Sequence, residues 1–116
     1  MPADNIINRE LVIQHLGHWP SFHDAEIVSL RFTRGVPGYW PVIYLKIDVI
    51  GIGLVELEFQ EVRDYKLDGF NHQNVIFDIS FNEENELINC EIDTSYGLGG
   101  SITAQSVAVR RFSPHL

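Results

Sequence analysis

Cysteine is nearly absent from this sequence, which holds Cys90 alone. An internal disulfide is therefore impossible, and the core has to hold the fold, as in proteins of a reducing compartment. Cys90 falls in phase with Ile88 and Ile92, so we expect a buried structural thiol and not a reactive one.

Long apolar runs are also missing. The longest, from Val49 to Val55, has seven residues, two of them glycines, whereas a membrane-spanning helix needs about 20. The first residues, Met-Pro-Ala-Asp, place no basic stretch before an apolar core, so no signal peptide is expected. We therefore expect a cytoplasmic protein that does not contact a membrane.

Positive charge is scarce, and one long segment has none. Eight Lys and Arg accompany 16 Asp and Glu, for a net charge of −8, and no Lys or Arg lies between Lys66 and Arg110. Such a surface repels phosphate backbones, which argues against nucleic-acid binding. It attracts a basic protein partner, although excess acid also serves solubility alone.

The remaining composition is that of one globular domain over residues 1–116. With 45% hydrophobic and 21% charged residues, the chain does not fit the pattern of disorder. A domain of this length buries roughly 65% of the surface of the open chain, which is enough for a core without disulfides or metals.

Residues 5–16 predict the one helix. Its apolar side chains recur at helical spacing: Ile6, Ile7, Leu11, Val12 and Leu16. Asp4 or Asn5 would cap its start, and Gly17 would end it in a left-handed turn. Pro20 prevents its continuation.

Apolar and polar residues then alternate in five segments, as in strands with one buried face. The residues expected to face inward are Val28, Leu30, Phe32, Ile43, Leu45, Ile47, Val49, Val55, Leu57, Phe59, Val75, Phe77, Ile79, Phe81, Ile88, Cys90 and Ile92. A sixth, weaker strand is expected over residues 102–112.

Short turns separate the strands, at residues 35–38, 51–53, 68–69, 82–85 and 97–100. Connections this short cannot hold crossover helices, so neighbouring strands should be antiparallel. We predict an α+β fold in which an N-terminal helix packs on a curved, mostly antiparallel sheet of about six strands arranged as a meander. A second sheet or a partial barrel stays open as an alternative.

The most distinctive stretch is residues 17–26, where the helix gives way to the sheet. Trp19 and Phe22 are expected to plug one end of the core, while Ser21, His23 and Asp24 satisfy backbone groups. An acid–base pair would need His23 and Asp24 in one pocket, but neighbouring residues on a strand point to opposite faces. A structural role is therefore favoured over catalysis.

Signatures of metal or enzyme chemistry are weak. The sequence has no cysteine pair and no His-x3-His on a helix, and zinc sites want three or four ligands at fixed spacing. Gly51-Ile52-Gly53 lies between two strands, so it predicts a hairpin turn and not a phosphate loop. We expect no enzyme, no bound metal and no cofactor. The alternative is a small metal- or ligand-binding module around His23, Asp24 and His72.

The outward phase of the central strands carries the candidate binding residues, Glu56, Glu58, Asp78, Glu91 and Asp93. We expect these carboxylates to share one sheet face, either simply solvated or docking a basic partner, since like charges across a ladder carry a cost. The aromatic-rich loops over residues 35–40 and 65–72 are the next candidates for a docking surface.

The string Trp19-Pro20-Ser21-Phe22-His23-Asp24-Ala25-Glu26 and the strand over residues 27–32 resemble the opening of the bacterial immunity protein 50 family. Residues 57–59, residues 73–76 and the turn before a last strand ending in Phe112 are also similar to that family. The resemblance covers nearly the whole chain.

The resemblance implies a small α+β protein that binds and neutralises the cognate toxin of a polymorphic toxin system, with no catalytic residues to carry over. Trp19, Pro20, Phe22, His23 and Asp24 would then define the fold and not the toxin contact. We expect a non-enzymatic inhibitor that binds a toxin, with a basic nuclease as one candidate, and the oligomeric state stays open. A purely structural partner domain is a third interpretation.

Overall fold

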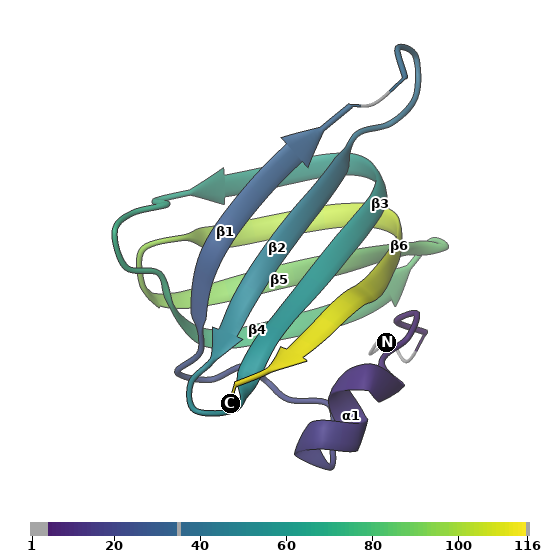
Figure 1. The fold of residues 1–116 in the computed structure, drawn as a ribbon. Helices are drawn as coiled ribbons and strands as arrows, with labels where there is room; N and C mark the ends of the chain where they lie inside the picture. Colours follow the sequence, from purple (N-terminus) through teal and green to yellow (C-terminus); the bar gives the residue numbers. More distant parts are fainter. Residues whose placement is uncertain (1–4, 35, 116) are drawn as a thin grey trace.

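Six strands dominate the structure, a computed structural model that describes residues 5–34 and 36–115. The elements in chain order are α1 (Glu10–Leu16), β1 (Glu26–Thr33), β2 (Val42–Val49), β3 (Gly53–Asp68), β4 (Val75–Glu84), β5 (Leu87–Tyr96) and β6 (Gly99–Pro114). The strands form a closed barrel in the order β1-β2-β3-β6-β5-β4, with all neighbours antiparallel (Figure 1). Within the described ranges, no helix is both long and apolar enough to cross a membrane.

The expected meander is wrong at β3, which pairs with β6 and not with β4. These two strands have 16 residues each and pair along their lengths, from Gly53 opposite Pro114 to Asp68 opposite Gly99. Together they connect the two walls of the barrel, since β3 also pairs with β2 and β6 also pairs with β5. In Figure 1, β1 and β2 lie at the front and β5 lies behind them. The barrel therefore buries its apolar face against itself, and the fold is mostly antiparallel sheet with one short helix.

The helix is shorter than expected, but it does pack on the sheet at β6: Val12 is fully buried with the core, and the His15 ring stacks on Phe112 with centroids 4.3 Å apart. Ile7 also pairs with β6, donating its N–H to Val107 O at 2.9 Å and accepting from Val109 N–H at 2.8 Å. A turn follows this bridge, with a left-handed φ of 61° at Asn8, so α1 begins only at Glu10 and lies beside β6 outside the barrel (Figure 1).

The prediction was wrong for the start of the helix and correct for its end. Asn5 lies five residues before the helix and does not cap it, and Asp4 lies outside the described residues. Gly17 ends the helix as predicted, with φ of 83° and its N–H donating to Ile13 O at 2.7 Å.

The barrel interior confirms the alternation of β2 and of the first half of β3. The inward residues there are fully buried: Ile43, Leu45, Ile47, Val55, Leu57 and Phe59. Cys90 is buried as well, and its burial, helped by the nearby Glu91 carboxylate, raises the pKa of the thiol far above its usual value. The predicted burial of this thiol is confirmed.

Two β-bulges overturn the inward assignment of Val28 and Phe77. The register of β1 shifts between Ile27 and Ser29, so Ile27 is buried and Val28 is 45% exposed. The register of β4 shifts around Ile76, which is buried, and Phe77 is 56% exposed. An extra residue in one strand reverses the face on which the following side chains fall.

Phe32 keeps the inward phase but is still 46% exposed. It pairs with Ile43 on β2, yet β1 shares only the pair Glu26–Val75 with β4, so no strand covers this end of β1. Its ring instead packs against Tyr65, with 5.1 Å between centroids.

The turn of the β4–β5 hairpin falls later than expected. β4 continues to Glu84, and Asn85 and Glu86 make the turn with φ of 55° and 65°. Positive φ at both central residues is what a two-residue hairpin with the usual strand twist requires. Of the predicted turn at residues 35–38, Gly35 lies outside the described residues.

Candidate functional site

The segment Trp19-Pro20-Ser21-Phe22-His23-Asp24-Ala25 closes the barrel between β1 and β4. The strands themselves share one register pair, so the main chain just before β1 supplies the other contacts. Its hydrogen bonds to β4 run from Asp24 N–H to Ile76 O (2.9 Å), from Ile76 N–H to Ala25 O (2.8 Å) and from Ile79 N–H to Ser21 O (2.9 Å). The most distinctive motif of the sequence is therefore the seam of the barrel.

Two aromatic side chains of this seam enter the core. Phe22 is 2% exposed, and Trp19 packs edge-on against Phe22 and Phe81, with ring centroids 5.7 and 6.0 Å apart. Phe22 adopts a left-handed φ of 64°, which directs the chain from the helix connection into the seam. Phe22 is thus a core residue, and Trp19 packs against the core while partly exposed.

His23 lies outside the core and contacts both the main chain and the ring of Phe77. Its Nδ1 is 2.7 Å from Phe77 O, and since a carbonyl oxygen only accepts, Nδ1 is the protonated nitrogen that donates. The imidazole also packs edge-on against the Phe77 ring, with centroids 5.2 Å apart.

The expectation that His23 and Asp24 face opposite sides is wrong. Both belong to a turn, Asp24 has a left-handed φ of 66°, and His23 Nε2 lies 3.5 Å from Asp24 Oδ1. Both line a hollow of about 360 Å³ together with His18, Ser21 and the hairpin residues around Ile50.

This arrangement lacks the geometry of a catalytic triad. A serine nucleophile needs a ring nitrogen of the histidine as its base, but the ring nitrogens of His23 face Phe77 O and Asp24. Ser21 Oγ instead accepts from the His23 main-chain N–H at 3.4 Å. The polar groups of the motif are thus engaged with the backbone and with one another.

The third residue of the alternative module, His72, is not part of this hollow. His72 contacts Asn71 Oδ1 through Nδ1 at 2.8 Å and packs against the Tyr96 ring, with centroids 5.9 Å apart. Among residues 5–34 and 36–115, no three His, Cys, Asp or Glu side chains come together as a metal site would require. The structure therefore brings together His23 and Asp24 but not His72.

The five candidate carboxylates fall into two groups, so the expectation of a single face is wrong. The reason is the strand order, because β6 lies between β3 and β5. Glu56 and Glu58 lie on β3, whereas Asp78, Glu91 and Asp93 lie on β4 and β5 with Asp78 directly opposite Asp93.

The second group belongs to a surface that we call the acidic hairpin, formed by β4, β5 and their turn. Its carboxylates are Asp78, Glu83, Glu84, Glu86, Glu91 and Asp93, and it contains no Lys, Arg or His. None of these six takes part in an ion pair with another described residue. Their negative charge is therefore presented to solvent.

The first group belongs to a second surface, the Tyr44 face, on the outside of β1, β2, β3 and β6. Its members are Arg31, Tyr44, Lys46, Glu56, Glu58, Arg110 and Arg111. The guanidinium carbons of Arg31 and Arg110 lie over the Tyr44 ring, 4.2 and 4.9 Å from its centroid. Arg110 also lies 3.6 Å from Glu56, so negative charge is offset here by nearby cations.

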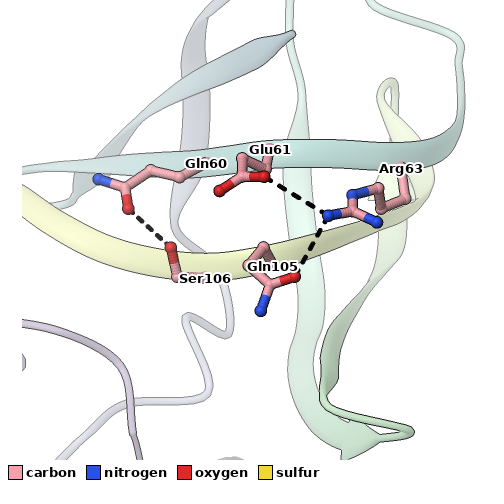
Figure 2. Close-up of polar contacts among 5 residues, drawn as sticks. All are labelled: Gln60, Glu61, Arg63, Gln105 and Ser106. Atoms are coloured by element: carbon pink, nitrogen blue, oxygen red, sulfur yellow. Dashed lines mark hydrogen bonds and ion pairs between the residues drawn. The ribbon is translucent and has the colours of Figure 1, made fainter. Parts of the chain in front are cut away.

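A third surface lies around Tyr39 and Trp40, next to a polar cluster that joins β3 to β6 (Figure 2). Of the second expected loop, over residues 65–72, the first four residues belong to β3. Tyr39 is 72% exposed and Trp40 is 49% exposed. The Arg63 guanidinium lies 4.7 Å from the Trp40 ring centroid and donates to Glu61 Oε1 at 3.4 Å and to Gln105 Oε1 at 3.3 Å. Beside it, Ser106 Oγ donates to Gln60 Oε1 at 2.6 Å.

Sequence reasoning missed two exposed aromatic residues on the acidic hairpin, Phe77 and Tyr96. Phe77 was expected inside because alternation continues through the bulge. Tyr96 ends β5 and is 48% exposed. Neither position carries a local signal of exposure, because the register shifts of β4 and β5 depend on their pairing.

A model of the family described as Immunity protein 50 matches residues 8–115 of the chain, a range that includes the helix and all six strands in full. No curated protein matches, and no solved structure matches.

Proposed function

Because the chain belongs to the immunity protein 50 family, we propose that it is a non-enzymatic, cytoplasmic protein that binds a cognate bacterial toxin and neutralises it. The family membership is the observation that carries this proposal. The seam agrees with it, since the main chain of the family-like motif and Nδ1 of His23 are used in contacts with β4.

We place the docking surface on the acidic hairpin, with Asp78, Glu91 and Asp93 as its central carboxylates. Glu56 and Glu58, on the Tyr44 face, are peripheral: Glu56 lies 3.6 Å from Arg110, and Glu58 is paired in register with Tyr44, whose ring the Arg31 and Arg110 guanidiniums cover. A charge that is already offset contributes little to the attraction of a partner. Six carboxylates without a cation among them favour a basic surface, such as the substrate site of a nuclease.

The proposed mechanism is occlusion by a stoichiometric complex. Charge attraction would speed the encounter, and contact over the hairpin would cover the basic site that the toxin uses for its substrate. A nuclease site is basic because it binds phosphates, so an acidic protein surface competes for the same groups.

The test pairs this chain with the toxin encoded beside its gene. Cells that express the toxin should survive only with the chain co-expressed, and the purified proteins should elute as one complex of defined stoichiometry. A double variant, Asp78→Lys with Asp93→Lys, should lose protection while staying folded. If the wild-type chain neither protects nor forms a complex at micromolar concentration, the proposed function is wrong.

A further inference from the structure

Phe77 stands out on the acidic hairpin as a large apolar side chain in a polar surrounding. Its ring is 56% exposed, although the neighbours Ile76 and Ile79 are 0% and 4% exposed. The bulge causes this, since Phe77 is the extra residue between the pairs Ile76–Thr94 and Asp78–Asp93. Phe77 therefore lies outside the barrel next to two carboxylates.

Tyr96 is a second exposed ring in the same hairpin, opposite Val75 in the register of β4 and β5. Each of the two rings is braced by a histidine. His23 packs edge-on against Phe77, and His72 packs edge-on against Tyr96, with centroids 5.2 and 5.9 Å apart. His23 also fixes the main chain of Phe77 through its bond to the carbonyl oxygen.

Bracing matters because a ring that is already held loses less conformational entropy when a partner covers it. Exposed single aromatic side chains are common and need no explanation by themselves. Here two rings are exposed, each is supported by a histidine, and carboxylates lie beside them in the register of the same two strands.

From this geometry we infer that Phe77 and Tyr96 form the anchor of the docking surface and that they receive Arg or Lys side chains of the partner protein. The inference rests on the proposed function and adds the residues that hold the toxin once it has arrived. Aromatic faces attract guanidinium and ammonium groups, and the adjacent Asp78 and Asp93 accept their N–H donors.

The carboxylates and the aromatic rings then contribute to different steps of binding. The carboxylates act over distance and set the association rate, whereas the rings act in contact and set the dissociation rate. Aromatic residues in well-packed positions are the usual energetic centres of an interface. The histidines that sequence analysis considered as metal ligands act here as supports for the two rings.

A hexa-arginine peptide tests the anchor without the toxin. Titrated into the labelled wild-type chain, the peptide should shift the ring signals of Phe77 and Tyr96 and leave those of Tyr39 in place. Phe77→Ala should weaken peptide binding three- to tenfold, as expected for loss of one cation–π contact. Tyr39→Ala, which removes an exposed ring from the third surface, is the matched control and should bind as the wild type does.

Binding to the toxin supplies the kinetic readout. Phe77→Ala should dissociate at least tenfold faster with little change in association, and Phe77→Leu should fall between the two because it keeps apolar bulk without the ring. Should Phe77→Ala not fold, Phe77→Leu and Tyr96→Ala carry the test. If all these variants bind peptide and toxin as the wild type does, while Asp78→Lys with Asp93→Lys weakens the complex, the anchor is wrong and the acidic docking surface stands. If the wild-type chain forms no toxin complex but the peptide shifts are seen, the proposed function fails and the Arg-binding patch remains.

Discussion

The acidic hairpin and the Tyr44 face lie on opposite walls of one barrel, and they handle charge in opposite ways. In the closed strand order, β2 and β5 are three positions apart, and Figure 1 places β2 in front of β5. The Tyr44 face combines four cations with two carboxylates and stacks two guanidiniums over one ring. The acidic hairpin has six carboxylates and no cation.

The difference teaches where the net charge of the molecule resides. The hairpin contributes a formal charge of −6 to a total of −8, so most of the imbalance lies on one wall. Solubility alone would be served by charge spread over the whole surface. The hairpin even places Asp78 directly opposite Asp93, an arrangement that costs stability. The uncompensated carboxylates make the acidic hairpin a candidate for binding, whereas those of the Tyr44 face lie beside cations.

The largest expected effect comes from loosening the wall that carries the acidic hairpin. Trp19→Ala removes the ring that packs against Phe22 and against Phe81 of β4, so we expect a loss of about 3 kcal/mol in the free energy of unfolding. Urea denaturation measures it. Tyr39→Ala, at a ring 72% exposed, should stay within about 0.5 kcal/mol of the wild type.

The folded Trp19→Ala protein should still associate with the toxin at the wild-type rate, because the carboxylates are unchanged. A variant that melts like the parent but no longer binds would move Trp19 from the seam into the interface. The assignment of a structural role to the seam and of binding to the acidic hairpin would then be wrong.

A smaller effect should separate the carboxylates of the two walls by their influence on stability. Asp93→Asn removes a like-charge pair with Asp78, so the free energy of unfolding should rise by about 0.2–1 kcal/mol. Glu56→Gln on the Tyr44 face removes the negative charge that faces Arg110 and should leave stability unchanged or slightly lower. The melting temperatures of the two variants and the wild type, measured at low ionic strength, give the comparison. Equal shifts of the same sign would show that both walls treat charge alike.

Much of the fold could be predicted because alternation is a local signal. The inward residues of β2 and the left-handed end of the helix at Gly17 followed from spacing and turn chemistry alone. Alternation fails at a bulge, since one extra residue leaves the pattern intact but reverses the faces, as at Val28 and Phe77. The predicted start of the helix was wrong because the pairing of Ile7 with β6 overrides the local capping signal.

The candidate site was harder to predict because it depends on which strands are neighbours. The sequence placed five carboxylates on outward positions, but only the pairing of β3 with β6 separates Glu56 and Glu58 from Asp78, Glu91 and Asp93. The motif around His23 was recognisable as distinctive, whereas its contact with Phe77, 54 residues away, has no signature in either segment.

The association rate with the toxin, measured by stopped-flow against ionic strength, tests the central claim most directly. Salt screens charge attraction over about 8 Å at physiological strength, so the wild-type rate should fall steeply as salt is added. Glu91→Lys on the acidic hairpin should slow association several-fold at low salt and flatten this dependence, while Glu58→Lys, with the same change of charge on the opposite wall, should change it far less. Equal slowing by the two variants, or a steeper effect of Glu58→Lys, would contradict the acidic hairpin as the docking surface.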